Sequence, residues 1–310
     1  MQIYLPIAEL SSNVLLLLVI GGAVGFVSGL FGVGGGFLLT PILMFLGIPP
    51  AVAVASQATQ VVAASVSGVL VHWNRGNVDF KMGLVLLMGG LTGSSFGVFL
   101  FSLLRAVGQV DLVIALAYFI TLGGVGGAMM FESVRALLRR RRRPGALRKL
   151  HQHTWVHGLP FKMRFRKSRL YISALLPAGV GFVVGMMAAI MGVSGSFVLV
   201  PAMIYLLGMP TAVVVGTSLF QAIFVAANVT FLQAVQNQTV DVLLAFLLLV
   251  GGVVGAQFGG RASGRLPADI MRILLAAIIL TVAVALGYTL VVKPDDLYSL
   301  AITAANGKTP

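Results

Sequence analysis

Two glycine-rich segments are the parts of this sequence best suited to bind a ligand. One begins at Gly32 and reads GVGGGFLLTP; the other begins at Gly192 and reads GVSGSFVLVP, with six of ten positions identical. Each leads into a short apolar run, which predicts a helix that starts inside an apolar layer. The first N–H groups of such a helix lack backbone partners and favour an anion, and glycine lets a ligand approach closely. The candidate residues are Gly34, Gly35, Gly36, Ser194, Gly195 and Ser196. Close helix packing is the alternative role of these glycines.

Polar residues interrupt the apolar run that follows each short segment. Polar groups placed in hydrocarbon need partners and face the interior of a helical bundle. They could donate hydrogen bonds to the oxygens of a bound anion, or they could tie neighbouring helices together, and both roles stay open here. The set comprises Ser56, Gln57 and Gln60 in the first run and Thr217, Ser218 and Gln221 in the second.

No ionisable residue lies near the centre of any apolar run. A proton relay or a cation site in the middle of the membrane would need carboxylates there, so an anionic or neutral ligand is favoured. The chain has no cysteine, no phosphate-binding lysine loop and no dinucleotide fingerprint. We therefore expect no enzymatic activity, no metal site and no cofactor. The acidic residues nearest the runs, all at their ends, are Asp79, Asp111, Glu132, Asp241 and Asp269.

Some of the remaining polar residues have simpler structural interpretations. Asp79 and Asp241 begin equivalent apolar runs, where an aspartate caps a helix. His72 could titrate near neutral pH, but an anchor at the membrane interface beside Trp73 is favoured. The histidines at 151, 153 and 157 fit a solvated basic loop better than a metal site.

The elements that carry these residues are membrane-spanning helices. The chain has 310 residues, of which 58 % are hydrophobic and 9 % are charged, and its mean hydropathy is +1.02. A soluble domain has about a quarter charged residues. Eight apolar runs are long enough to cross the bilayer, which takes about 20 residues; the runs at 35–47 and 195–207 are shorter and either span or re-enter. The ten runs are 13–31, 35–47, 51–73, 82–102, 110–131, 171–191, 195–207, 212–232, 240–260 and 269–292.

The chain is internally duplicated. Residues 49–60 align with 210–221, and Val78-Asp79 aligns with Val240-Asp241, in the same order as the glycine-rich segments and at an offset near 161. The sequence thus predicts an all-α polytopic membrane protein with two homologous five-segment halves. Because five crossings is an odd number, the halves should be inverted in the membrane, with the short segments near the midplane. We expect an N-terminal repeat over 1–131, a linker over 132–170, and a C-terminal repeat with a short tail over 171–310.

The net charge of +13 belongs to the linker. Thirteen basic residues and no acidic residue lie between Arg135 and Arg169, and the rest of the chain is balanced. A loop this basic beside membrane spans is cytoplasmic by the positive-inside rule, and loop charges reverse between the two halves as inversion requires. Anionic lipid headgroups are the expected partner of this loop, and no nucleic acid is expected. The sequence does not indicate the oligomeric state of the protein.

These motifs resemble the TauE/SafE family of sulfite exporters. The resemblance rests on GLFGVGGGF at 29–37 with Pro41, GVSGS at 192–196 with Pro201, GTSL at 216–219 and RGNVD at 75–79. Ser56-Gln57 stands where the family more often has Thr-Ser. The resemblance implies a secondary carrier of sulfite, thiosulfate, organosulfonates or related carboxylates in the bacterial cytoplasmic membrane, often exporting. The alternatives to a carrier are an anion channel and a membrane scaffold that recruits a partner through the basic loop.

Overall fold

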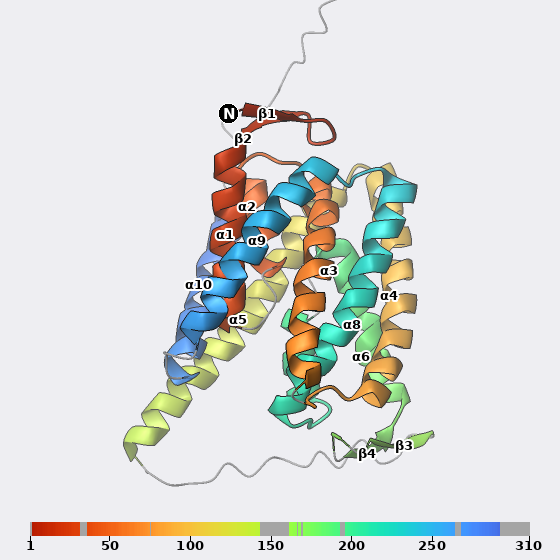
Figure 1. Ribbon diagram of the computed structural model, residues 1–310, viewed down its shortest axis with the longest axis vertical. Coiled ribbons are helices and arrows are strands. Elements are labelled where there is room, and N and C mark those ends of the chain that lie inside the picture. The colour runs from red at the N-terminus through yellow and green to blue at the C-terminus, as the bar shows by residue number, and fades with distance from the viewer. Residues whose placement is uncertain are drawn as a thin grey trace, which may run out of the picture.

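The structure is a bundle of helices without an extended sheet. The computed structural model describes residues 2–31, 36–74, 76–142, 161–165, 167–168, 170–192, 196–263 and 268–291. Figure 1 shows the helices packed side by side, with most of them running along the long axis. Helices suit a membrane because hydrocarbon offers no hydrogen bonds to the backbone, so each N–H and C=O group must be paired within the chain.

Ten α-helices account for most of the described residues. Seven of them are long and apolar enough to cross a membrane. Large apolar side chains on their outer faces, such as Leu15, Met88 and Phe131, are exposed; such a surface is typical of contact with lipid. The helices are α1 (Val14–Phe31), α2 (Gly36–Phe45), α3 (Pro50–Asn74), α4 (Phe80–Ala106), α5 (Val110–Arg142), α6 (Leu175–Met191), α7 (Ser196–Tyr205), α8 (Thr211–Leu232), α9 (Val242–Ser263) and α10 (Ala268–Val291), with a π-helical turn η2 (Gln233–Asn237) after α8.

The structure corrects the sequence prediction in three places. The run at 171–191 is not one long helix, because it begins in a strand and leaves α6 only 17 residues, short of the roughly 20 that a span takes. The helix α5 continues to Arg142, so the start of the predicted linker is helical. Two hairpins were not predicted: β1 (Gln2–Leu5) with β2 (Leu10–Asn13), and β3 (Lys162–Phe165) with β4 (Leu170–Ser173).

Glycines let helices from the two halves of the sequence pack backbone to backbone. The most extensive contacts join α1 to α9 and α4 to α6. A Cβ atom added at Gly255 of α9 would lie 1.9 Å from the carbonyl oxygen of Gly22, and one added at Gly93 of α4 would lie 2.0 Å from that of Phe182. Both distances are far below van der Waals contact, so only glycine fits. Gly89 of α4 packs in the same way, because a Cβ atom there would lie 2.0 Å from the carbonyl oxygen of Ala178.

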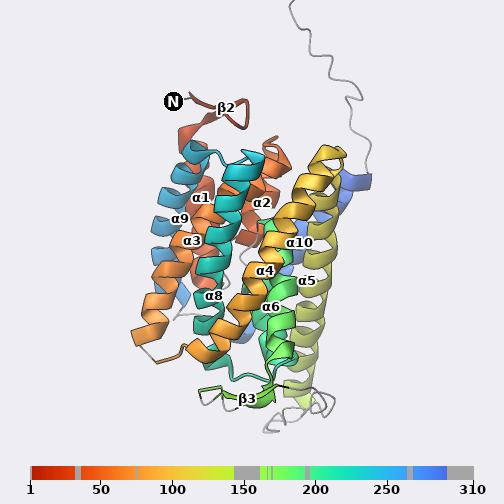
Figure 2. The same cartoon turned by 90° about the vertical axis from the view of Figure 1, so that its right-hand side faces the viewer.

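The contacts between the halves come in equivalent pairs. The Cβ positions of Gly25 and Gly185 each lie 2.2 Å from a glycine carbonyl oxygen, that of Gly252 and Gly90 respectively. The first helix of each half therefore packs on the fourth helix of the other. The two hairpins, each of which precedes such a first helix, lie at opposite ends of the bundle in both views (Figure 1 and Figure 2).

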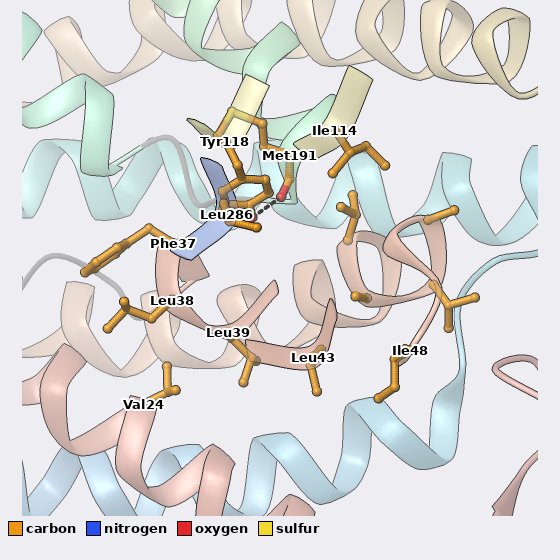
Figure 3. Close-up of a cluster of buried hydrophobic side chains, with 14 of the residues drawn as sticks. Val24, Phe37, Leu38, Leu39, Leu43, Ile48, Ile114, Tyr118, Met191 and Leu286 are labelled. Carbon is orange, nitrogen blue, oxygen red and sulfur yellow. Dashed lines mark hydrogen bonds between the residues drawn. The ribbon is translucent and has the colours of Figure 1, made fainter. Parts of the chain in front are cut away.

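The short helix α2 is buried in the core instead of lying on the surface. Phe37, Leu38, Leu39 and Leu43 are at most 3 % exposed, and Figure 3 shows them among residues of other helices. Pro41 lies within α2 and is also buried. Because α2 is only ten residues long, it occupies part of the bilayer thickness and places its first residue inside the bundle.

Candidate functional site

Both predicted helix interruptions are present where the glycine-rich segments lie. The helix α1 ends at Phe31 and α2 begins at Gly36, while α6 ends at Met191 and α7 begins at Ser196. The prediction that each motif leads directly into a short helix is therefore confirmed. Four of the candidate ligand-binding residues, Gly34, Gly35, Ser194 and Gly195, lie outside the described residues. Their role stays a prediction.

Gln57 connects the two interruptions. Its side chain is fully buried on α3, and its Nε2 donates to the carbonyl oxygen of Gly36 and, at 3.0 Å, to that of Gly192. Its Oε1 accepts from the hydroxyl of Thr40 on α2. One amide therefore bonds both the start of α2 and the end of α6, which are 156 positions apart in the chain (192 minus 36). Of the six polar candidates, Gln57 is the one that the fold brings to both interruptions.

The carboxyl end of α6 receives hydrogen bonds from three other parts of the chain. The last carbonyl groups of a helix have no partner within it. Here Tyr118 of α5 donates to the carbonyl oxygen of Met191 (Figure 3), Gln57 to that of Gly192, and Gln233 of η2 to that of Ala189 at 3.4 Å. Gly192 itself has φ +65°, and a Cβ there would lie 2.5 Å from the carbonyl oxygen of Val54.

Tyr118 and Gln233 were missed by reasoning from the sequence. Tyr118 lies inside an apolar run, where a tyrosine resembles any other core aromatic residue. The available signal was its hydroxyl, because a buried tyrosine in the middle of a span needs a hydrogen-bond partner. The sequence could not identify that partner, since Met191 is 73 positions away and accepts through its backbone.

Two of the predicted site residues connect helices at the ends of the bundle instead of reaching the interruptions. The hydroxyl of Ser56 accepts from the backbone N–H of Asp241 at 2.9 Å, and that of Thr217 accepts from the N–H of Asp79 at 3.0 Å. Ser56 and Thr217 are equivalent positions in the two halves, and so are the two aspartates. Their role in tying helices together is the one that these contacts favour.

The remaining three candidates are buried and differ in how fully they are bonded. Gln60 and Gln221, also equivalent positions, each donate at 3.4 Å to a backbone carbonyl oxygen of the opposite half, those of Leu248 and Leu86. The Oε1 of Gln221 has no hydrogen-bond partner among the described residues. Ser218 donates to a carbonyl of its own helix. The unpartnered acceptor of Gln221 needs a donor that the described contacts do not supply.

The two buried aspartates do more than cap helices. The Oδ1 atoms of Asp79 and Asp241 accept from backbone N–H groups in the first turns of α4 and α9, as predicted for N-caps. Their Oδ2 atoms accept at 3.1 Å from the N–H groups of Ser168 and Ile7, which belong to the β3–β4 and β1–β2 hairpins. Each aspartate thus fixes the hairpin of one half to the fourth helix of the other.

We predict that Asp79→Ala and Asp241→Ala each lower the free energy of unfolding by about 1–3 kcal/mol, since a cap and a hydrogen bond to a buried carboxylate are lost. Thermal unfolding of the purified protein in detergent measures this. The control is Ser102→Ala, whose hydroxyl donates to the carbonyl oxygen of Phe99 in its own helix. If both aspartate variants melt like this control, the aspartates do not hold the hairpins.

His72 lies near the end of α3, where Trp73 is 55 % exposed and packs edge-on against Phe80 with ring centroids 5.0 Å apart. An exposed tryptophan at the end of a span is typical of the membrane interface, and the anchoring role of His72 and Trp73 stays a prediction. A proton-transfer role of His72 stays untested. The histidines at 151, 153 and 157 lie outside the described residues.

The fold defines a multi-pass membrane protein, and two interrupted helix pairs at equivalent positions of the two halves are typical of transporters. The chain belongs to the sulfite exporter TauE/SafE family, whose model matches residues 17–286. A probable membrane transporter protein of Bacillus subtilis, YjnA, is 30 % identical over 85 % of this chain and 96 % of its own length. A probable membrane transporter protein of Xylella fastidiosa is 28 % identical over 85 % of this chain and 91 % of its own length. No solved structure matches the chain significantly.

Proposed function

We propose that this protein is a secondary transporter that carries small anions, of the sulfite, thiosulfate, organosulfonate or carboxylate class, out of the cell by alternating access. The observation that carries the proposal is the convergence of both helix interruptions on Gln57. In transporters built from repeats, discontinuous helices meet at the substrate site. The family and its probable transporter relatives support the same reading.

The chemistry of the interior favours an anion. The helix α2 begins inside the bundle, where Gly36 is buried, and α7 begins at the equivalent position of the second half. A helix start carries a partial positive charge and free N–H groups. We propose that backbone N–H groups and hydroxyls of the two glycine-rich segments hold the anion. The contacts would come from Gly34, Gly35, Gly36, Ser194, Gly195 and Ser196, with Gln57, Gln60, Ser218 and Gln221 along the path.

We infer that the two halves are inverted repeats that rock against each other. The equivalent cross-half contacts of Gly25 and Gly185, and the hairpins at opposite ends of the bundle, support this arrangement. Inversion would place both termini outside and the basic linker at the cytoplasmic face, beside anionic headgroups. Each aspartate with its hairpin would then fix one end of the bundle.

Counterflow in proteoliposomes is the test of this function. Vesicles that contain the protein are loaded with unlabelled sulfite, and labelled sulfite is added outside with thiosulfate, sulfoacetate, sulfate or acetate as competitors. We expect saturable uptake that needs internal substrate and that the preferred anion inhibits most. Uptake that does not saturate and needs no internal anion would indicate a channel. No uptake of any of these anions by folded protein would contradict the proposal.

The scaffold alternative makes a different prediction for the basic linker. A carrier whose site lies among the helices keeps basal flux when residues 143–160 are replaced by a neutral linker of equal length, because no residue of the proposed site is changed. A scaffold would lose its function altogether in the same variant. Counterflow by this variant and by the intact chain, at matched protein content, separates the two.

A further inference from the structure

The fourth helix of each half packs against the other half of the sequence. The most extensive contacts of α4 are with α6 and then with α8, and those of α9 are with α1 and then with α3. Among the described residues, α4 makes only sparse contacts with α1, α2 and α3 of its own half, and α9 makes only sparse contacts with α6, α7 and α8. In packing terms, the two halves have exchanged their fourth helices.

Backbone contacts hold each exchanged helix against its neighbour. Gly93 and Gly97 lie one turn apart on α4, and a Cβ atom added at Gly97 would lie 2.8 Å from the carbonyl oxygen of Met186 on α6. A Cβ atom added at Gly29 of α1 would lie 2.2 Å from the carbonyl oxygen of Ala256 on α9. Helices packed this closely cannot slide past each other without collision, so α4 must move with α6, and α9 with α1.

Hydrogen bonds join the third helices to the same pairs. The Nδ2 of Asn228 on α8 donates to the hydroxyl of Ser94 on α4 at 2.9 Å. The hydroxyl of Ser56 on α3 accepts from the backbone N–H of Asp241, which caps α9. Both bonds link the two halves of the sequence, and they add α8 to the α4–α6 pair and α3 to the α9–α1 pair.

A buried apolar cluster follows the same grouping. It combines Met82 and Leu86 of α4 with residues of the second half, such as Val184 of α6, Met203 of α7 and Val214 of α8. Among the described residues, none of its buried members comes from α1, α2 or α3. The helix α4 therefore shares its core with the second half of the chain.

We propose that the two bodies that move against each other during alternating access have exchanged fourth helices. The α4 body comprises α4, α6, α7, α8 and the β3–β4 hairpin, and the α9 body comprises α1, α2, α3, α9 and the β1–β2 hairpin. The helices α5 and α10 pack on each other (Figure 2) and form a separate pair. The inference rests on the proposed function, because it specifies which helices rock together.

The two bodies are joined directly by the short connections between α3 and α4 and between η2 and α9. Gly76 lies in the first connection with φ +69°, and Gln238 lies in the second with φ +51°. The two positions are equivalent, at an offset of 162 (238 minus 76) that Asp79 and Asp241 share. A few loop residues commonly absorb the change of backbone angles in a rigid-body motion, so these two connections are the hinges of the proposed motion.

Cross-linking tests the grouping, because the chain has no cysteine of its own that could react. Ser94→Cys with Asn228→Cys allows α4 to be joined to α8, where the two native side chains are 2.9 Å apart. A short thiol-reactive cross-linker then ties the first half of the sequence to the second but stays within the α4 body. Counterflow should remain within about twofold of the value before cross-linking, because a rigid-body motion leaves contacts inside a body unchanged.

A matched pair joins the same helix α8 to the other body. Gly68→Cys with Leu219→Cys connects α3 to α8, where the Cβ position of Gly68 lies 3.7 Å from the Cγ of Leu219. Oxidation to a disulfide should lower counterflow about tenfold or more, and reduction should restore it. A third pair, Gly126→Cys with Ile279→Cys, connects α5 to α10 and should be tolerated like the first. Counterflow before cross-linking shows that each variant is folded.

Motion of intact sequence halves predicts that all three cross-links stop counterflow. Loss of counterflow after joining α4 to α8, or α5 to α10, would therefore overturn the inference and leave transport standing, and either pair is sufficient if the other variant does not fold. Unchanged counterflow with α3 joined to α8 would also overturn it. If the intact protein shows no counterflow of any tested anion, the proposed function fails and the inference fails with it.

Discussion

Gln57→Glu is expected to abolish anion transport while the protein still inserts and folds. The glutamate side chain has nearly the same size but lacks the NH₂ group, so an ionised carboxylate donates to neither Gly36 nor Gly192 and a protonated one to only one of them. At least one buried carbonyl therefore loses its donor at the point where both interruptions meet. Each unmade buried hydrogen bond costs about 1–3 kcal/mol, so the counterflow rate should fall by roughly a hundredfold or more.

A matched control variant shows whether the loss of transport depends on the position of Gln57 or only on replacing a glutamine by a glutamate. Gln109→Glu alters the same residue type at an exposed site in the turn between α4 and α5, and it should transport like the intact protein. Membrane content and unfolding temperature of both variants show whether the protein is folded. If folded Gln57→Glu protein has a counterflow rate within about threefold of that of the intact protein, transport does not require the Gln57 amide.

The interruptions and their helices could be predicted because their cause is local. Glycine before a short apolar run, followed by a proline-containing turn, indicates a short helix wherever the rest of the chain lies. For the same reason the caps by Asp79 and Asp241 were predicted correctly. The start of α6 was not, because the apolar residues of β4 are also consistent with a helix and a short apolar run does not distinguish the two.

The partners of the polar residues could not be predicted, because they depend on packing between halves. Gln57 and Ser56 are neighbours in the sequence, yet one reaches both helix interruptions and the other bonds the backbone of Asp241. Their side chains leave α3 in directions about 100° apart, so each faces a different helix. Which helix lies on each side is a tertiary property, and the same limit concealed the contact of Tyr118 with Met191.

The glycines that join the halves should tolerate no side chain. In Gly93→Leu and Gly255→Leu, even the first added carbon would lie within about 2 Å of a backbone oxygen on the facing helix. A backbone oxygen cannot move aside alone, so the two helices must separate along their length and lose the contacts of neighbouring residues. We expect both variants to yield no folded protein, as judged by gel filtration after extraction from the membrane.

Alanine substitutions at the same positions distinguish packing from helix propensity, because the two effects change the unfolding temperature in opposite directions. Alanine favours a helix over glycine by about 1 kcal/mol, so Gly124→Ala, which has nothing within 4 Å of its Cβ position, should leave the unfolding temperature unchanged or raise it. Gly93→Ala and Gly255→Ala should lower it, because overpacking costs about 1–3 kcal/mol or more and exceeds the gain in propensity. An equal rise in all three variants would mean that the helices can separate freely, and that the backbone contact between the halves does not hold the bundle together.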